Sequence, residues 1–158
     1  MKRGSIIFLK VVIALIGILT LAGMIRFPLT EGRAVNLDLF SIYSDPFILY
    51  GYLASIAFFV ALYQAFKLLG YIGENKVFSL NSVKALRTIK YCAVILGASI
   101  ILAILYIRLF AGGDDSAGPT AIGILATFIS IVVATVAAVF EKLLQSAVDI
   151  KSENDLTV

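Results

Sequence analysis

Four long apolar runs divide the chain, and charged residues collect at their ends and between them. The runs cover residues 6–25, 47–69, 91–110 and 121–140. Each is close to the length of about 20 residues that a helix needs to cross the hydrocarbon core of a bilayer. A helix also satisfies all its backbone polar groups internally, as lipid requires. The pattern therefore predicts an all-α membrane protein with four transmembrane helices, forming a single domain over residues 1–158.

The composition agrees with this prediction. Hydrophobic residues make up 61% of the chain and charged residues 15%, against about 45–50% and about 25% in soluble domains. The net charge of +3 would also suit a nucleic-acid-binding protein. The basic residues, however, flank the apolar runs, where they orient membrane helices. We therefore expect the lipid bilayer as a partner and no direct binding of nucleic acid.

The orientation follows from a basic connector, Lys67–Lys90, which contains a single acid, Glu74. Short loops rich in Lys and Arg stay in the cytoplasm during insertion. With four spans, both termini then lie on the cytoplasmic side. That side would hold Lys2, Arg3, Lys10, Lys67, Lys76, Lys84, Arg87, Lys90, Lys142 and Lys151, and the outer side Arg26, Arg33 and Arg108. We predict an antiparallel N-in/C-in bundle in the plasma membrane.

Local signals place several helix ends. Asp45 can cap the second helix with Pro46 at its first position, and Gly70 is placed to end it. Ser79 is a candidate cap for a helix that starts at Leu80 and runs without a break into the third span. Pro119 similarly suits the first position of the fourth helix.

Residues 26–46 form a long first outer loop in which Val35, Leu37 and Leu39 alternate with polar residues. This spacing fits a short strand or an extended cover over the helices. The loop could act as a lid over a ligand, or it could simply lie among lipid headgroups. The first run itself begins like a signal peptide, but it is longer than a usual signal sequence and lacks a clear cleavage pattern. We expect it to be retained.

Beyond the fourth span, the tail 141–158 continues a helical period, so helices three and four both extend into the cytoplasm. One side of this tail is apolar and consists of Leu143, Leu144, Ala147, Val148 and Ile150. An amphipathic face of this kind needs a cover. The cover could be a cytoplasmic protein, or it could be the protein's own connector helix, Leu80–Ile89.

The end of the tail carries Glu153, Asn154 and Asp155. Two uses of this polar motif stay open. It could bind a partner, or it could cap the inner end of the bundle through the basic connector residues Lys84, Arg87 and Lys90.

Several kinds of chemistry are disfavoured. The chain has no histidine and one cysteine, Cys92, which excludes an internal disulfide, Cys/His metal sites and dithiol redox chemistry. Ionisable groups are missing from the centres of the spans, which disfavours proton-coupled transport. We expect no enzyme activity, no metal and no cofactor. The polar residues inside the spans are expected to form interhelical hydrogen bonds; they are Thr20, Ser55, Gln64, Ser99, Thr127, Ser130 and Thr135.

Two stretches carry a resemblance to a known family. The ending from Glu153 to Val158, after Ala147-Val148-x-Ile150-Lys151, is the more specific; the second is Phe78-Ser79 with Val83-Lys84-x-Leu86-Arg87. Here the chain resembles the bacterial and archaeal family called domain of unknown function 2975. The resemblance covers nearly the full chain. It implies a small four-span membrane protein, and, because a gene for a small helix-turn-helix regulator often lies nearby, it suggests a regulatory partner.

The sequence thus favours a regulatory or interaction role with a cytoplasmic partner. The alternative is a small transporter or channel component, or a passive binder of a lipid-like ligand. Ala134-x-x-x-Ala138 allows close helix approach. We expect it to pack within the bundle, while a homo-oligomer seam stays open.

Overall fold

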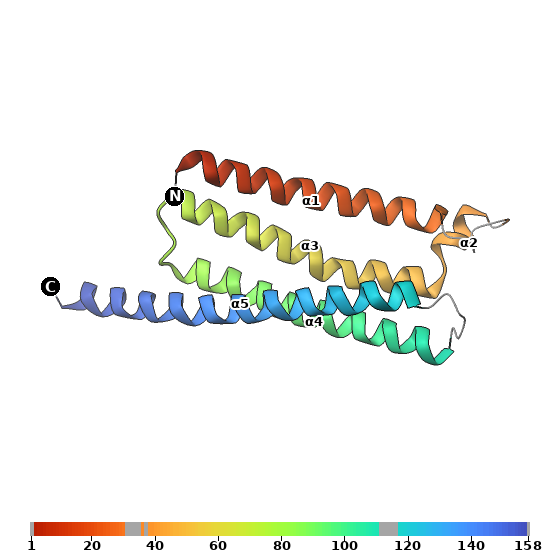
Figure 1. Cartoon of the computed structure of the whole chain (residues 1–158). Coiled ribbons are helices and arrows are strands. Elements are labelled where there is room, and N and C mark those ends of the chain that lie inside the picture. The colour runs from red at the N-terminus through yellow and green to blue at the C-terminus, as the bar shows by residue number, and fades with distance from the viewer. Residues whose placement is uncertain (1, 31–35, 37, 111–116, 158) are drawn as a thin grey trace.

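Four long helices account for most of the computed structural model, which describes residues 2–30, 36, 38–110 and 117–157. These are α1 (Arg3–Thr30), α3 (Pro46–Gly73), α4 (Leu80–Phe110) and α5 (Ala117–Leu156), with a short α2 (Leu39–Tyr43) between the first two (Figure 1). Each long helix is long and apolar enough to cross a membrane. The predicted all-helical class is therefore confirmed, and the four long helices are candidate membrane spans.

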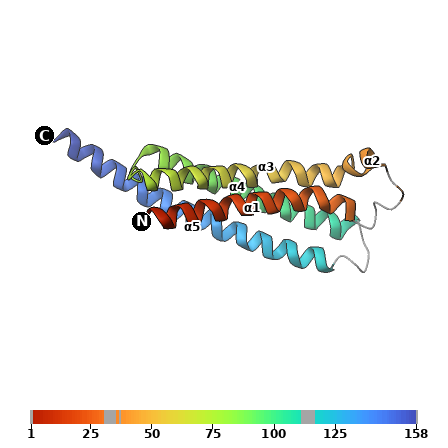
Figure 2. The ribbon, with the colours of Figure 1, turned by 90° about the horizontal axis from the view of Figure 1, so that it is seen from above.

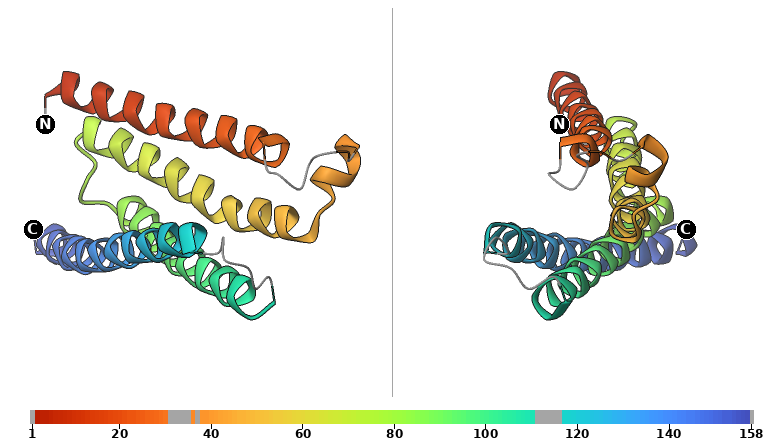
Figure 3. Two further views of the ribbon diagram at one scale, coloured as in Figure 1. Left: turned by 45° about the vertical axis from the view of Figure 1, so that its right-hand side comes forward. Right: turned by 90° about the vertical axis from the view of Figure 1, so that its right-hand side faces the viewer.

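The long helices run antiparallel, as predicted, and they form an open row and not a compact bundle. The extensive contacts join α1 to α3, α3 to α4, and α4 to α5. Consecutive helices run in opposite directions, and the end-on view in Figure 3 shows α1 at one end of the row and α5 crossing α4 at the other. Both termini lie at the same end as the connector between α3 and α4 (Figure 1). We call this the connector end and the opposite end the loop end.

The predicted helix starts are largely confirmed. The Asp45 carboxylate accepts a hydrogen bond from the Phe47 N–H at 2.8 Å. The Ser79 hydroxyl oxygen accepts one from the Ser82 N–H at 3.3 Å, and α4 continues from Leu80 to Phe110 without a break. The fourth helix begins at Ala117, slightly before the predicted proline position.

The predicted end of the second span at Gly70 is wrong, because α3 continues to Gly73. The chain leaves the helix through Asn75, whose φ of 57° lies in the left-handed region that asparagine tolerates. The Lys76 N–H then donates to the Tyr71 carbonyl at 2.8 Å. Gly70 instead gives room to Lys10, whose Nζ lies 3.7 Å from where a Cβ on Gly70 would stand.

The tail is a direct continuation of the last span. The helix α5 runs for 40 residues and ends only at Leu156, and Figure 2 shows its last turns projecting past the other helices. In the first outer loop, Leu39 begins α2. Val35 and Leu37 lie outside the described residues, so the predicted strand-like alternation stays untested.

A seam of small residues joins α4 and α5. Its members are Ala93, Gly97, Gly123, Ser130 and Ala137. A Cβ on Gly97 would lie 3.3 Å from the Ser130 Cβ, and a Cβ on Gly123 would lie 2.8 Å from Ile104. The small residues of the fourth span therefore pack within the protein, as expected. The buried position is Ala137, whereas Ala134 and Ala138 are half-buried.

The prediction for the polar residues of the spans is wrong at four positions. Ser55, Ser99, Thr127 and Thr135 each donate to a carbonyl of their own helix, at 2.6–2.8 Å. A serine or threonine in a helix reaches its own preceding turn more easily than a neighbouring helix.

Tyrosines make the interhelical bonds instead. The Tyr52 hydroxyl donates to the Met24 carbonyl and the Tyr43 hydroxyl to the Ile25 carbonyl, both at 2.9 Å. Pro28 lacks the N–H that would normally bond to the Met24 carbonyl, four residues earlier in α1. Tyr52 therefore supplies the donor that Pro28 removes, which lets α1 continue to Thr30.

Candidate functional site

An ion triad fixes α5 to α4 at the connector end. The Glu141 carboxylate accepts hydrogen bonds from Arg87 Nε at 2.7 Å and from Lys90 Nζ at 2.6 Å. Glu141 is only 8% exposed. Since a buried charge is stable only when it is paired and hydrogen-bonded, the three side chains form one structural unit.

The triad lies on the same line of contacts as the small-residue seam. Along α5, Gly123, Ser130 and Ala137 recur every seven residues, and Glu141 follows one turn later. Along α4, Lys90 lies between buried Leu86 and Ala93. Alternating steps of three and four residues keep one helical face toward a partner. Glu141 thus reaches Lys90 because both occupy contact positions.

The triad also fixes the charge of Glu141. The hydrogen bonds from Lys90 and Arg87, in that order, hold the pKa of the Glu141 carboxyl below its ordinary value of 4.5 despite its burial. The same contact raises the pKa of Arg87. The carboxylate is therefore ionised at neutral pH, and the unit is held by charge-assisted bonds, which are the stronger kind.

The sequence named Arg87 and Lys90 and left open whether Glu153 and Asp155 pair with them; in the structure the acid that pairs with both is Glu141. The cap that we allowed for Glu153 and Asp155 is supplied by Glu141, within the described residues. Glu153, Asn154 and Asp155 are exposed in the last turns of α5, and Lys84 is exposed on α4. The seven-residue spacing that ends at Glu141 was the signal that would have identified it.

The connector itself is folded tightly against the start of α4. The Ser82 hydroxyl donates to the Lys76 carbonyl at 3.2 Å and lies 3.2 Å from the Ser79 hydroxyl. Ser82 and Val83 are the most deeply buried side chains of the described residues. The first turns of α4 therefore present a fixed surface to the tail.

Half of the apolar tail face is partly covered within the protein. Leu144, Ala147 and Val148 are half-buried. The ion triad holds this part of α5 beside the first turns of α4. The covered half therefore consists of Leu144, Ala147 and Val148, three of the five predicted residues.

The other half of the tail face is uncovered. Leu143 and Ile150 are exposed, Ile150 by 60%, while Phe78 in the connector is exposed by 57% and Leu156 by 84%. A groove of about 540 Å³ runs between Phe78 and the end of α5, and its other lining residues are Ala147, Ile150, Lys151, Asn154 and Asp155. We call this the tail groove. Asn154 and Asp155 of the predicted motif therefore line a surface that is free for another molecule within the described chain.

Comparison with known proteins adds the family. A model of the family described as "Protein of unknown function (DUF2975)" matches residues 29–158. The chain belongs to the DUF2975 family. Its similarity to the "Uncharacterized membrane protein YoaS" of Bacillus subtilis (strain 168) is 46% identity over 161 residues, with all of each chain covered. No solved structure matches. This member of the DUF2975 family is thus a multi-pass membrane protein with four candidate spans.

Proposed function

We propose that the protein is a membrane-anchored regulatory protein that holds a soluble cytoplasmic partner at its tail groove. The role is an interaction and not a catalysis. The observation that carries the proposal is the uncovered apolar surface formed by Phe78 in the connector and by Ile150 and Leu156 on α5, the helix that projects past the others (Figure 2).

The proposal requires the connector end to face the cytoplasm. The basic residues at that end are Lys2, Arg3, Lys10, Lys67, Lys76, Lys84, Arg87, Lys90, Lys142 and Lys151, whereas Arg26 and Arg108 are the described basic residues near the loop end. This asymmetry supports an N-in/C-in orientation. A fusion reporter after Val158 tests it: we expect activity of a cytoplasmic reporter, and activity of a reporter that works only outside the cell would contradict the orientation.

An apolar surface in the cytoplasm favours an occupant. Burying a large apolar side chain gains about 1.5–3 kcal/mol, and an amphipathic helix is the usual ligand of an apolar groove. The described tail residues 149–157 include Asp149, Glu153 and Asp155 but only one basic residue, Lys151. The surrounding charge therefore suits a partner helix with basic flanks.

A small DNA-binding regulator fits this chemistry, because such proteins are basic. The family resemblance suggests the same kind of partner. A regulator held at the membrane would be kept from its DNA sites or released from the membrane by a change in the tail groove. This is the specific partner class that we propose.

Site-specific photo-cross-linking in living cells tests the partner. A photoreactive amino acid at Ile150 should capture a basic cytoplasmic protein of one defined mass, identified by mass spectrometry. The matched control is Ser146, which is exposed on the same helix but does not line the groove. The product should disappear in Phe78→Asp. Equal capture at both positions, or no capture at Ile150, would contradict the proposal.

A further inference from the structure

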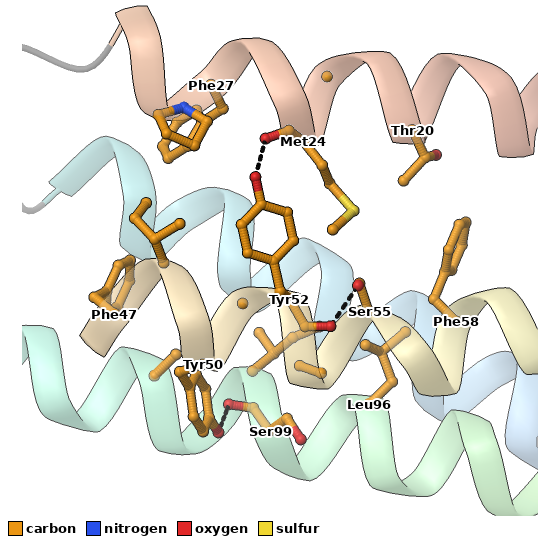
Figure 4. A pocket seen from close by; sticks show the side chains of 17 residues that line it. Thr20, Met24, Phe27, Phe47, Tyr50, Tyr52, Ser55, Phe58, Leu96 and Ser99 are labelled. Carbon is orange, nitrogen blue, oxygen red and sulfur yellow. Dashed lines mark hydrogen bonds between the residues drawn. The ribbon is translucent and has the colours of Figure 1, made fainter. Parts of the chain in front are cut away.

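A second cavity opens on the surface of the spanning part of the molecule, between α1, α3 and α4. Its volume is about 610 Å³, within the range of about 300–1,000 Å³ that is usual for small-molecule sites. Figure 4 shows Met24 and Phe27 on α1 above it, and Phe58 and Leu96 on α3 and α4. The lining within the described residues includes none from α5. The cavity is thus a consequence of the open row of helices.

The polar groups around the cavity are already engaged. The Tyr52 hydroxyl donates to the Met24 carbonyl, the Tyr50 hydroxyl to the Ser99 carbonyl at 2.7 Å, and the Ser55 hydroxyl to the Tyr52 carbonyl at 2.6 Å (Figure 4). Throughout the described chain, every buried side-chain nitrogen or oxygen has a partner. An occupant therefore meets a wall that is predominantly apolar and gains little from polar groups of its own.

The cavity is elongated along the helices. Its lining extends from Phe47 to Phe58 on α3 and from Thr20 to Pro28 on α1. At a rise of about 1.5 Å per residue, these segments cover roughly 16 Å and 12 Å. The hydrocarbon core of a bilayer is about 30 Å thick. The cavity therefore has the depth of one leaflet and lies in the half of the membrane near the loop end.

Two glycines keep the cavity wide. Gly23 on α1 and Gly51 on α3 both line it, and a Cβ on either would meet nothing within 4 Å. Gly17, nearer the connector end, would already place its Cβ 3.6 Å from Leu62. The two helices are thus in ordinary contact at Gly17 and leave open space farther along.

We propose that this cavity holds one acyl chain of a membrane lipid from the leaflet at the loop end. An apolar slot one leaflet deep matches the shape and chemistry of such a chain. Empty space would cost the dispersion contacts of its lining atoms, and a chain restores them. The headgroup plays no part, so lipids with different headgroups occupy the site alike.

Photolabelling of the full chain in lipid nanodiscs tests the proposal. The probe is a phosphatidylcholine with a diazirine at the middle of one acyl chain, and the labelled residues are mapped by peptide mass spectrometry. We expect labelling concentrated at Met24, Phe58 and Leu96, and the same pattern with a phosphatidylglycerol probe. Labelling at equal density on the exposed residue Phe8, remote from the cavity, would overturn the site, as would dependence on the headgroup.

Filling variants make the test decisive. Gly23→Phe should lower labelling of the cavity by about tenfold, whereas Ala22→Phe, on an exposed position that does not line the cavity, should leave it unchanged. Gly51→Leu adds less volume and serves if Gly23→Phe fails to fold. Unchanged labelling in a folded filling variant would overturn the proposal. The tail groove is remote from these changes, so its partner capture stays as in the wild type.

Discussion

The space around the glycines shows that the α4–α5 side of the molecule and the α1–α3 side are packed differently. Between α4 and α5, a Cβ on Gly123 or Gly97 would stand only 2.8 Å or 3.3 Å from the neighbouring helix. Between α1 and α3, the corresponding distance is 3.6 Å at Gly17, and at Gly23 and Gly51 nothing lies within 4 Å. The first side is in close contact at these glycines, with a smaller pocket of about 380 Å³ beside them, and the second opens into a cavity of about 610 Å³.

The difference shows what holds helices together in lipid. Apolar surface alone gives no preference, because lipid tails are as apolar as leucine. The α4–α5 side combines close backbone approach with the ion triad, and it forms the support from which the tail projects. At the loop end, the Tyr52 hydroxyl joins α3 to α1 and the Tyr43 hydroxyl joins α2 to α1. The cavity on the α1–α3 side has room for a ligand without loss of these hydrogen bonds.

The largest expected difference comes from placing leucine at a glycine on the α4–α5 side and at a glycine on the α1–α3 side. Gly97→Leu should destabilise the protein by about 3 kcal/mol, because the added side chain forces α4 away from the Ser130 side chain on α5. Gly51→Leu, in open space, should stay within about 1 kcal/mol of the wild type. The measurement is unfolding by SDS titration in mixed micelles. Equal costs would show that the two sides are packed alike.

Removing the charge of the triad should have the next largest effect. Glu141→Gln leaves Arg87 and Lys90 without their carboxylate, and we expect a loss of about 2 kcal/mol in the same unfolding measurement. The matched control is Glu74→Gln. Glu74 pairs with Lys76 at 2.9 Å in an exposed position and should have no measurable effect. A similar cost for both variants would mean that burial of Glu141 does not matter.

Lowering the pH should gradually remove the stability that the Glu141 carboxylate contributes. Because folding lowers the pKa of Glu141 below 4.5, its contribution is complete above that ordinary value. It is lost as the pH falls through the lower value of the folded state. The stability difference between the wild type and Glu141→Gln should therefore be largest at neutral pH and shrink below pH 4.5. A difference that stays constant on acidification would contradict the ionised triad.

The smallest effect concerns the loop end of the α1–α3 side. Tyr52→Phe removes the donor to the Met24 carbonyl and should cost about 1 kcal/mol. In a Pro28→Ala background the restored N–H can bond to that carbonyl. The cost of Tyr52→Phe should then become smaller, as a double-mutant cycle would measure. If the two changes in unfolding free energy were strictly additive, the Tyr52 hydrogen bond would not depend on Pro28.

The sequence by itself determined the four spans, the cap at Asp45, the start of α4 after Ser79 and the helical continuation of the tail. These features follow from the local sequence, because span length and capping depend on residues that are close along the chain. The sequence also identified the residues of the connector end, including Arg87 and Lys90. It did not pair them with Glu141, because an ion pair depends on the register between two helices.

Only the tertiary structure decided which faces meet. A span surrounded by lipid is apolar on all sides, so its hydrophobic pattern carries little information about which neighbour it packs against. For that reason the open row, the split of the tail face into a covered half near Leu144 and an uncovered half near Ile150, and the cavity beside Gly23 and Gly51 emerged only from the fold. The spacing of small residues brings α4 and α5 together, and the contacts between helices leave α1 at the edge.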